Sequence, residues 1–205
     1  MSLRILSSGE RALLAEVDTL DEVLALFGAL DADRPPGLVD LVPAARTVGV
    51  VVDPRILPLS VARAWIEHAR PRRAIVDREA VVEIPVRYDG PDLAEVAALL
   101  SVTPAEVIHL HVSSVWRVAF GGFAPGFGYL VTDHDRLRVP RRSTPRTAVP
   151  AGSVGLADDF SGVYPRSSPG GWQLIGTTDA VLWDAEADPP ALLRPGTTVR
   201  FREAP

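Results

Sequence analysis

The sequence predicts an α+β protein of two domains, and two patterns along the chain support this. In the first 87 residues, short β-rich segments and amphipathic helices follow the order strand, helix, strand, strand, helix, strand. This is the order of the split βαβ arrangement in ferredoxin-like domains. From residue 88 onward, two short helices precede many short strands separated by proline and glycine, which is typical of a closed barrel or a sandwich. We therefore expect a ferredoxin-like domain at residues 1–87 and a mostly β domain at residues 88–205.

The elements of the N-terminal domain follow from hydrophobic periodicity and helix caps. Residues 12–17 form an apolar run that fits a strand, and residues 19–30 place their apolar side chains on one helical face. Thr19 and Glu22 have the spacing of a capping box, which predicts where this helix begins. Further strands are expected at residues 37–42, 46–53 and 80–86, and a second helix at residues 59–70.

The C-terminal domain is predicted to begin with helices at residues 89–100 and 103–111. Thr103 is placed as the N-cap of the second helix, with Pro104 at its first position. The remaining β-like segments lie between Pro and Gly clusters, at residues 113–121, 146–157, 170–178, 180–185 and 197–203.

Composition excludes several classes of function. The chain carries a formal net charge of −5, and it has no basic tract of the kind that binds nucleic acid or an anionic membrane. It contains neither lysine nor cysteine. Schiff-base chemistry, a biotinylated lysine, a P-loop lysine, thiolate catalysis and cysteine-ligated zinc are therefore excluded for this chain. The N-terminal residues lack the pattern of a signal peptide, and no run of about 18 apolar residues occurs, so we expect a cytoplasmic location.

Two histidines lie close together at the end of the second C-terminal helix. His109 and His111 are two residues apart, so on a helix they point about 200° from each other, whereas on a strand they would share a face and hold a metal. The helical prediction therefore argues against a metal site. A histidine at this place most often caps helix carbonyls, with a catalytic role for His111 as the alternative.

Three glycine-rich and proline-rich segments between residues 121 and 178 are the strongest candidates for a site. Glycines there fit tight barrel corners, while the aromatic residues among them provide apolar walls for a pocket. Gly152 and Gly155 are candidates to present backbone N–H groups to an anion. The segment around Ser153 lacks the glycine and the following helix of a nucleophile elbow, so we do not expect a serine nucleophile. Forked anion contacts are expected from Arg142, Arg146 and Arg166.

These segments carry a resemblance to a known family. The runs "YDGPDLAEVAALL", "HVSSVWRV", "GFAPGFGYL" and "VPRRSTPRTAVPAGSVGLADDFSGVYPRSSPGGWQLIGTT" resemble the B subunit of bacterial 5-oxoprolinase, also called the KipI family, carboxyltransferase domain subunit 1 or allophanate hydrolase subunit 1. The resemblance extends from about residue 12 to residue 202. It implies a ferredoxin-like domain followed by a cyclophilin-like β-barrel.

The resemblance also implies an activity and partners. Members of this family work with a C subunit (carboxyltransferase domain subunit 2) and, transiently, with an A subunit in the ATP-dependent opening of 5-oxo-L-proline to L-glutamate. We accordingly expect ATP and Mg²⁺ in the assembled complex, no cofactor on this chain alone, a lactam or amide substrate, and no nucleic-acid or membrane partner. Other relatives inhibit a histidine kinase or belong to urea carboxylase and allophanate chemistry, and fold alone does not choose among these functions.

The family motifs imply a set of site residues. The implied catalytic residues are His111 and Arg146. The implied substrate-binding residues are Phe123, Pro125, Gly126, Phe127, Gly152, Ser153, Tyr164, Gly170, Gly171 and Trp172. The sequence departs from the family at Phe160 and Ser161, where many relatives have glutamine and threonine. A site built around an amide loses discrimination without it, so this departure bears on which substrate is used.

Overall fold

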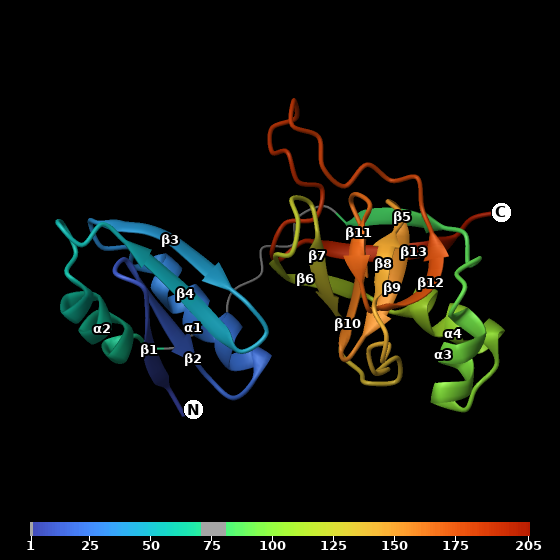
Figure 1. Cartoon of the computed structure of the whole chain (residues 1–205), viewed down its shortest axis with the longest axis horizontal. Coiled ribbons are helices and arrows are strands. Elements are labelled where there is room, and N and C mark those ends of the chain that lie inside the picture. The colour runs from blue at the N-terminus through green and yellow to red at the C-terminus, as the bar shows by residue number, and fades with distance from the viewer. Residues whose placement is uncertain (1, 71–80) are drawn as a thin grey trace. The chain divides into compact units, whose positions relative to one another are not determined.

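The computed structural model describes residues 2–70 and 81–205, and the chain divides into two compact units, Met1–Val76 and Asp77–Pro205 (Figure 1). The division falls among residues 71–80, which lie outside the described part, and it precedes the boundary expected at residue 87. The two units have separate hydrophobic cores. The predicted α+β class is confirmed.

The N-terminal unit is a four-stranded antiparallel sheet with two helices. Its strands lie in the order β1-β2-β4-β3, and buried residues on α1, α2 and the strands form its core. The predicted capping box of α1 is present, because the Thr19 side chain accepts a hydrogen bond from the Glu22 backbone and the Glu22 carboxylate accepts one from the Thr19 backbone. The elements are β1 Arg4–Ser8, β2 Ala12–Glu16, α1 Leu20–Ala32, β3 Leu38–Pro43, β4 Thr47–Val52 and α2 Leu59–His68.

The sequence-based prediction of the last strand in this unit was wrong. The segment at residues 80–86 forms β5 (Val82–Val86), which pairs with the other sheet, while residue 80 lies outside the described residues. Beside β2, where a split βαβ unit places its last strand, the sheet instead has β1. Periodicity identifies a strand but does not determine its partner, so the alternation of residues 80–86 fitted either sheet.

The C-terminal unit is a barrel built from a seven-stranded sheet. Its strand order is β12-β9-β10-β7-β6-β13-β5. Arg87, directly after β5, bridges Thr177 at the end of β12, and the two residues exchange backbone hydrogen bonds of 2.8 and 2.7 Å. These bonds join the two edge strands, so the sheet closes on itself. The other strands of this sheet are β6 Trp116–Gly121, β7 Gly128–Val131, β9 Ser153–Ala157, β10 Phe160–Val163, β12 Gln173–Thr177 and β13 Thr198–Glu203. Two further strands, β8 Arg146–Val149 and β11 Ser168–Gly170, pair with each other in a separate two-stranded sheet.

The two predicted helices of this unit are confirmed. Helix α3 (Leu93–Leu100) packs against β12, and α4 (Pro104–Ser113) begins at the predicted cap Thr103 and packs against β13 (Figure 1). Taken singly, none of the described helices is long and apolar enough to cross a membrane, and only α3 and α4 counted together, with a bend of 89° between them, reach that length and composition.

Two of the predicted strands differ in the structure. The segment at residues 146–157 is two strands, β8 and β9, because Gly152 has a φ of +78° and turns the chain between them. The segment at residues 180–185 forms only an isolated bridge between Trp183 and Ala191, within the long loop from β12 to β13. Pro189 and Pro190 lie in the returning arm of that loop, and proline has no N–H to donate to a strand ladder.

Alternation along the barrel strands produces two cores. Inward-facing side chains such as Val154, Leu156 and Leu130 fill the barrel, together with residues of α3 and α4. Outward-facing residues of β7, β9, β10 and β12 meet Val149 of β8 in a second cluster that is mainly aromatic. Of the predicted site residues, Phe127, Tyr164 and Trp172 belong to this outer cluster.

Candidate functional site

The outer cluster is a set of aromatic rings arranged around Phe127. Its ring makes edge contacts with Tyr129, Tyr164 and Trp172, at centroid distances of 5.0, 5.5 and 5.3 Å. Such T-shaped contacts are the favoured geometry for aromatic pairs. Phe127, Tyr164 and Trp172 are buried, whereas Tyr129 is only half-buried. The cluster is therefore a packed aromatic platform with part of its surface open to solvent.

The segment that begins the cluster makes a tight turn between β6 and β7. Gly126 has a φ of +84°, and a Cβ there would lie 2.9 Å from the carbonyl oxygen of Leu182, so only glycine fits. The two phenylalanines of this segment separate: Phe127 is buried, while Phe123 is 57% exposed and contacts Phe127 and Tyr164 through ring edges. Pro125 is exposed beside them.

Tyr164 is where the other predicted glycine segments meet. A Cβ on Gly170 would lie 2.5 Å from the Tyr164 hydroxyl oxygen, so this glycine makes room for the phenol. The Gly152 N–H donates to the Tyr164 carbonyl at 2.8 Å, and the Tyr164 N–H donates to the Ser153 carbonyl at 2.9 Å. The N–H of Gly152 is thus already used, which corrects the expectation that it faces an anion. Gly155 lies inside β9 between two paired strands.

Ser153 has no elbow geometry. It is buried and begins strand β9, which agrees with the expectation that it is not a nucleophile. Gly171 accepts a hydrogen bond from the Arg142 N–H at 2.8 Å through its carbonyl. The structure therefore brings together every predicted substrate-binding residue around the aromatic cluster or in the turns beside it.

Arg146 and Arg142 converge on one buried carboxylate. Asp92 is 3% exposed, and its Oδ1 accepts hydrogen bonds from Arg146 at 2.6 Å and from Arg142 at 2.9 Å. Its Oδ2 accepts the Leu174 N–H at 2.7 Å. Arg146 lies on β8 opposite Gly170, and so adjoins Tyr164. Asp92 therefore fixes both guanidinium groups at the edge of the aromatic cluster.

Positive charge lies near the two phenols of the cluster. Burial raises the pKa of Tyr129 and of Tyr164, and the positive charge of Arg141 opposes this rise at both hydroxyls. The positive charge of Arg146 also opposes the rise in the pKa of Tyr164. Arg141 and Arg166 are both exposed, and Arg166 lies in the connection between β10 and β11. Phenols, guanidinium groups and an apolar platform together suit a small ligand that carries a carboxylate.

His111 is not part of this surface. It is fully buried inside the barrel, stacked on Phe201 at 4.2 Å, and its Nδ1 and Nε2 lie 2.8 Å from the Tyr88 hydroxyl and 2.9 Å from the Ser161 hydroxyl. The expected bond to helix carbonyls is replaced by these two side chains. Ser161 points inward from β10 and its neighbour Phe160 belongs to the outer cluster, so the strand separates His111 from the predicted substrate-binding residues.

The burial of His111 predicts a pH dependence of stability. Desolvation lowers the pKa of His111 to about 3, below the ordinary histidine value near 6.5. Between these values the unfolded chain binds a proton that the folded chain does not, so the free energy of unfolding falls as pH decreases, by up to about 1.4 kcal/mol per pH unit. Urea unfolding from pH 7 to pH 4 should show a shallower acid limb for His111→Gln than for the wild type, and parallel limbs would contradict this.

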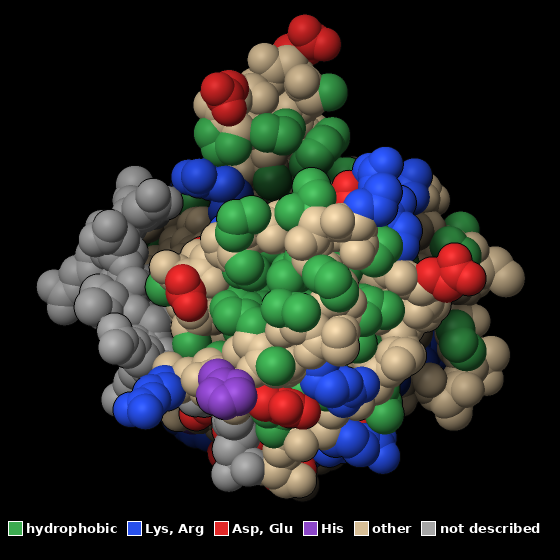
Figure 2. Space-filling model, turned by 90° about the vertical axis from the view of Figure 1, so that its left-hand side faces the viewer, with side chains coloured by type: hydrophobic (Ala, Val, Ile, Leu, Met, Phe, Trp, Pro, Cys, Tyr) green, Lys and Arg blue, Asp and Glu red, His purple; other side chains and the backbone are tan. Residues whose placement is uncertain are grey.

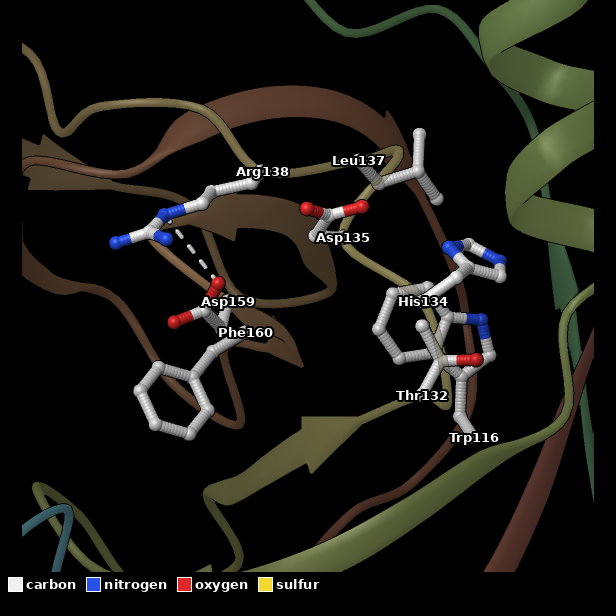
Figure 3. Close-up of a pocket in the computed structure, with 8 residues that line it drawn as sticks. All are labelled: Trp116, Thr132, His134, Asp135, Leu137, Arg138, Asp159 and Phe160. Atoms are coloured by element: carbon white, nitrogen blue, oxygen red, sulfur yellow. Dashed lines mark ion pairs between the residues drawn. The ribbon is translucent and has the colours of Figure 1, made fainter. Parts of the chain in front are cut away.

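A small hollow lies elsewhere on the barrel unit. It has a volume of about 10 Å³, room for about one water molecule, and its lining includes Trp116, His134, Asp135 and Phe160 (Figure 3). Arg138 and Asp159 form an ion pair at its rim. None of the predicted catalytic or substrate-binding residues lines this hollow, and Phe160 is the residue that it shares with the aromatic cluster.

Comparison with known proteins places the chain in a family. The profile described as "Carboxyltransferase domain, subdomain C and D" matches residues 3–193. A protein of Escherichia coli O157:H7, named as the B subunit of 5-oxoprolinase, is 43% identical over 173 residues, which cover 81% of this chain and 78% of that protein. The chain belongs to the carboxyltransferase subdomain C and D family. It spans between 52% and 78% of the three curated relatives of this name.

Two solved structures resemble the fold of this chain. The crystal structure titled TTHA0988 matches with a TM-score of 0.79 and 40% identity, covering 95% of this chain and 40% of that one. The urea amidolyase of Kluyveromyces lactis matches with a TM-score of 0.76 over 98% of this chain and 15% of that one, at 18% identity, and so shows a shared fold.

The sequence did not reveal the role of Asp92. It lies in the run "YDGPDLAEVAALL", which by itself predicts only the start of a helix, and its partner Arg146 is 54 residues away along the chain. Tyr129 and Arg141 are likewise absent from the predicted site residues. The available signal was an acidic residue before an apolar helix together with the arginines at 141, 142 and 146, but nothing in one sequence pairs them.

Glycine at position 152 is expected to be required for the turn into β9. A Cβ there would lie 2.2 Å from the Thr178 carbonyl oxygen, in addition to the strain of its φ of +78°. Gly152→Ala should therefore lower the free energy of unfolding by about 2–3 kcal/mol. Gly196→Ala is the matched control, because its φ is +90° and its Cβ meets nothing within 4 Å. Equal losses for the two variants in urea unfolding would show that backbone strain alone, without the clash, sets the effect.

Proposed function

We propose that this chain is the B subunit of an ATP-dependent 5-oxoprolinase, which opens 5-oxo-L-proline to L-glutamate together with its C and A subunits. The observation that carries the proposal is the convergence of three separate motif segments on one partly open aromatic and arginine surface, in a chain 43% identical to a protein named as the B subunit of 5-oxoprolinase. We propose a cytoplasmic location for the complex.

The surface has the features that the substrate requires. 5-Oxo-L-proline is a small ring that carries one carboxylate and one lactam carbonyl. Guanidinium groups bind a carboxylate in a forked geometry, and Arg146 and Arg141 are the groups available beside the phenols of Tyr164 and Tyr129. The aromatic platform matches the apolar carbons of the ring. We propose that Arg146 contacts substrate and that Asp92 positions it.

The lactam must be activated before water opens it. We propose that ATP, with Mg²⁺, transfers its γ-phosphoryl group to the lactam carbonyl oxygen in the assembled complex and leaves as ADP. Water then adds to the activated carbon, and the C–N bond breaks to give the free amine and an acyl phosphate. A second water hydrolyses the acyl phosphate to the carboxylate of glutamate and inorganic phosphate. Fixed N–H donors and arginine charge then stabilise the negative charge that develops. The chain has no lysine, so phosphate contacts from this chain would come from arginine or backbone N–H groups.

For His111 we propose a positioning role in place of the implied catalytic one. Its burial keeps it from substrate, and its low pKa keeps the imidazole neutral at pH 7. Through Ser161 it supports strand β10 from inside the barrel, and the outer face of that strand carries Phe160.

A second candidate is a different amide substrate, and Phe160 is the observation that favours it. The residue is half-buried and makes ring-edge contacts with Phe120 and Tyr129 at 5.8 and 5.4 Å. A glutamine in this outward-facing place would offer an amide to a ligand, while phenylalanine offers only apolar surface.

The two candidates are separated by substrate-dependent ATP hydrolysis. The complex assembled from this chain with the C and A subunits should hydrolyse ATP in response to 5-oxo-L-proline and give no response to urea or allophanate. The reverse pattern would replace the first candidate with the second. Phe160→Gln tests whether residue 160 decides between the two candidates. If 5-oxo-L-proline is the substrate of the wild type, this variant should keep the preference for it.

A further inference from the structure

The long loop between β12 and β13 exposes large apolar side chains beside the aromatic cluster. Val181 is 69% exposed, Trp183 42% and Leu192 38%. The loop adjoins the turn that carries the exposed Phe123, because a Cβ on Gly126 would lie 2.9 Å from both the Leu182 carbonyl oxygen and the Trp183 Cβ. Figure 2 shows this loop projecting at the top, with hydrophobic side chains gathered below acidic ones at its tip.

Buried anchors and hydrogen bonds between its two arms hold the loop, and the exposed apolar side chains lie on this supported segment. Leu182 and Leu193 are buried and anchor its two arms in the barrel core. Between the arms, the Leu192 N–H donates to the Leu182 carbonyl at 3.1 Å and the Asp184 N–H donates to the Pro190 carbonyl at 2.9 Å. A fixed surface with an exposed tryptophan is typical of a protein-binding site.

The charges of the loop indicate what kind of partner it fits. Asp184, Glu186 and Asp188 lie at its tip, and no ion pair joins any of them to a basic side chain in the described part of the chain. An apolar patch with an acidic border fits a surface of apolar side chains bordered by lysine or arginine. Charge also argues against a second copy of this chain, because a two-fold contact places the same acidic patch on both sides.

We propose that Val181, Trp183, Leu192 and Phe123 form the docking surface for the C subunit, and that the part of this partner seated there is apolar with a basic border. The inference rests on the proposed function, since it takes the companion protein from it. The surface adjoins the aromatic cluster through Phe123, which contacts Tyr164. Docking at this place would cover the open side of the proposed substrate site.

Calorimetric titration of the full chain with the purified C subunit tests the docking surface. Trp183→Asp should weaken binding at least tenfold, because it places a charge in the centre of the apolar contact. Leu99→Asp is the matched control, since Leu99 is 47% exposed on α3 of the same unit and lies outside the surface; it should bind as the wild type does. Circular dichroism should show both variants folded.

A second variant examines the acidic border without touching the apolar centre. The triple change Asp184→Asn, Glu186→Gln and Asp188→Asn should slow association with the C subunit, and it should reduce the dependence of the association rate on salt. Asparagine at position 184 keeps an oxygen for the bond that Asp184 Oδ1 now accepts from the Glu186 N–H at 3.0 Å, so the loop conformation is retained.

The outcomes separate this inference from the proposed function. Tight binding of the C subunit that Trp183→Asp leaves unchanged overturns the docking surface and leaves the proposed function in place. No binding of the C subunit to the wild type overturns both. Self-association of the wild type that Trp183→Asp abolishes would assign the surface to a second copy and overturn the choice of partner.

Discussion

Replacing Asp92 with alanine is expected to lower the free energy of unfolding by about 3 kcal/mol, because it removes the buried carboxylate from two half-buried guanidinium groups and leaves the buried Leu174 N–H without its acceptor. Asp92 is 3% exposed and holds Arg142, Arg146 and the Leu174 N–H through its two oxygens. Its own N–H donates to the Leu174 carbonyl at 3.0 Å, which joins the start of α3 to β12. Alanine keeps this backbone bond, so the loss comes from the ion-pair network and from the side-chain bond to the Leu174 N–H.

The control for this prediction is Asp179→Ala. Asp179 also binds an arginine through both oxygens, with bonds of 2.8 and 3.1 Å to Arg87, but its side chain is 83% exposed. Exposed ion pairs contribute at most about 1 kcal/mol, because water solvates both charges when they separate. Urea unfolding of the two variants measures the difference. A loss below about 1 kcal/mol for Asp92→Ala would contradict the role assigned to its burial.

Replacing Arg146 with lysine is expected to lower kcat/KM of the assembled enzyme for 5-oxo-L-proline by about a hundredfold, the size of effect that follows loss of one fixed donor at a reacting centre. Lysine keeps the positive charge but has no planar fork, so it cannot bind Asp92 and a substrate carboxylate in the same geometry. If Arg146 binds the substrate carboxylate, which stays charged throughout the reaction, the loss of kcat/KM should come chiefly from a higher KM. If Arg146 stabilises negative charge that forms only in the transition state, the loss should come from a lower kcat.

Arg138→Lys is the matched control for Arg146→Lys. Arg138 makes a surface ion pair with Asp159 at 3.3 Å beside the small hollow, away from the predicted substrate-binding residues. It should leave kcat/KM unchanged. Activity of Arg146→Lys equal to that of the wild type would remove Arg146 from the site and leave its bond to Asp92 as a purely structural contact.

Much of the fold was predictable because local signals decide single elements. The capping box of Thr19 and Glu22 and the cap at Thr103 both mark helix starts that the structure confirms. Pairing of strands was not predictable in the same way. The strand at residues 82–86 joins the barrel by parallel pairing with β13, more than 100 residues later, and its own periodicity contains no information about that partner.

The candidate site shows the same division between local and long-range information. The glycines at 126, 152 and 170 could be singled out from the sequence, and the structure gives each one a close contact that a side chain would violate. The burial of His111 could not be foreseen, because an imidazole near a helix end has the same local sequence whether it faces solvent or the barrel core. Asp92 was missed for the same reason, since its importance comes from arginines distant in sequence.

The central claim is that this chain is a required part of a 5-oxoprolinase, and the most direct test is formation of L-glutamate from 5-oxo-L-proline and ATP. The purified C and A subunits would be assayed with and without this chain, with product measured by chromatography. The account predicts that glutamate forms only when all three proteins are present and that this chain alone forms none. Equal glutamate formation without this chain, or none from the complete set, would contradict it.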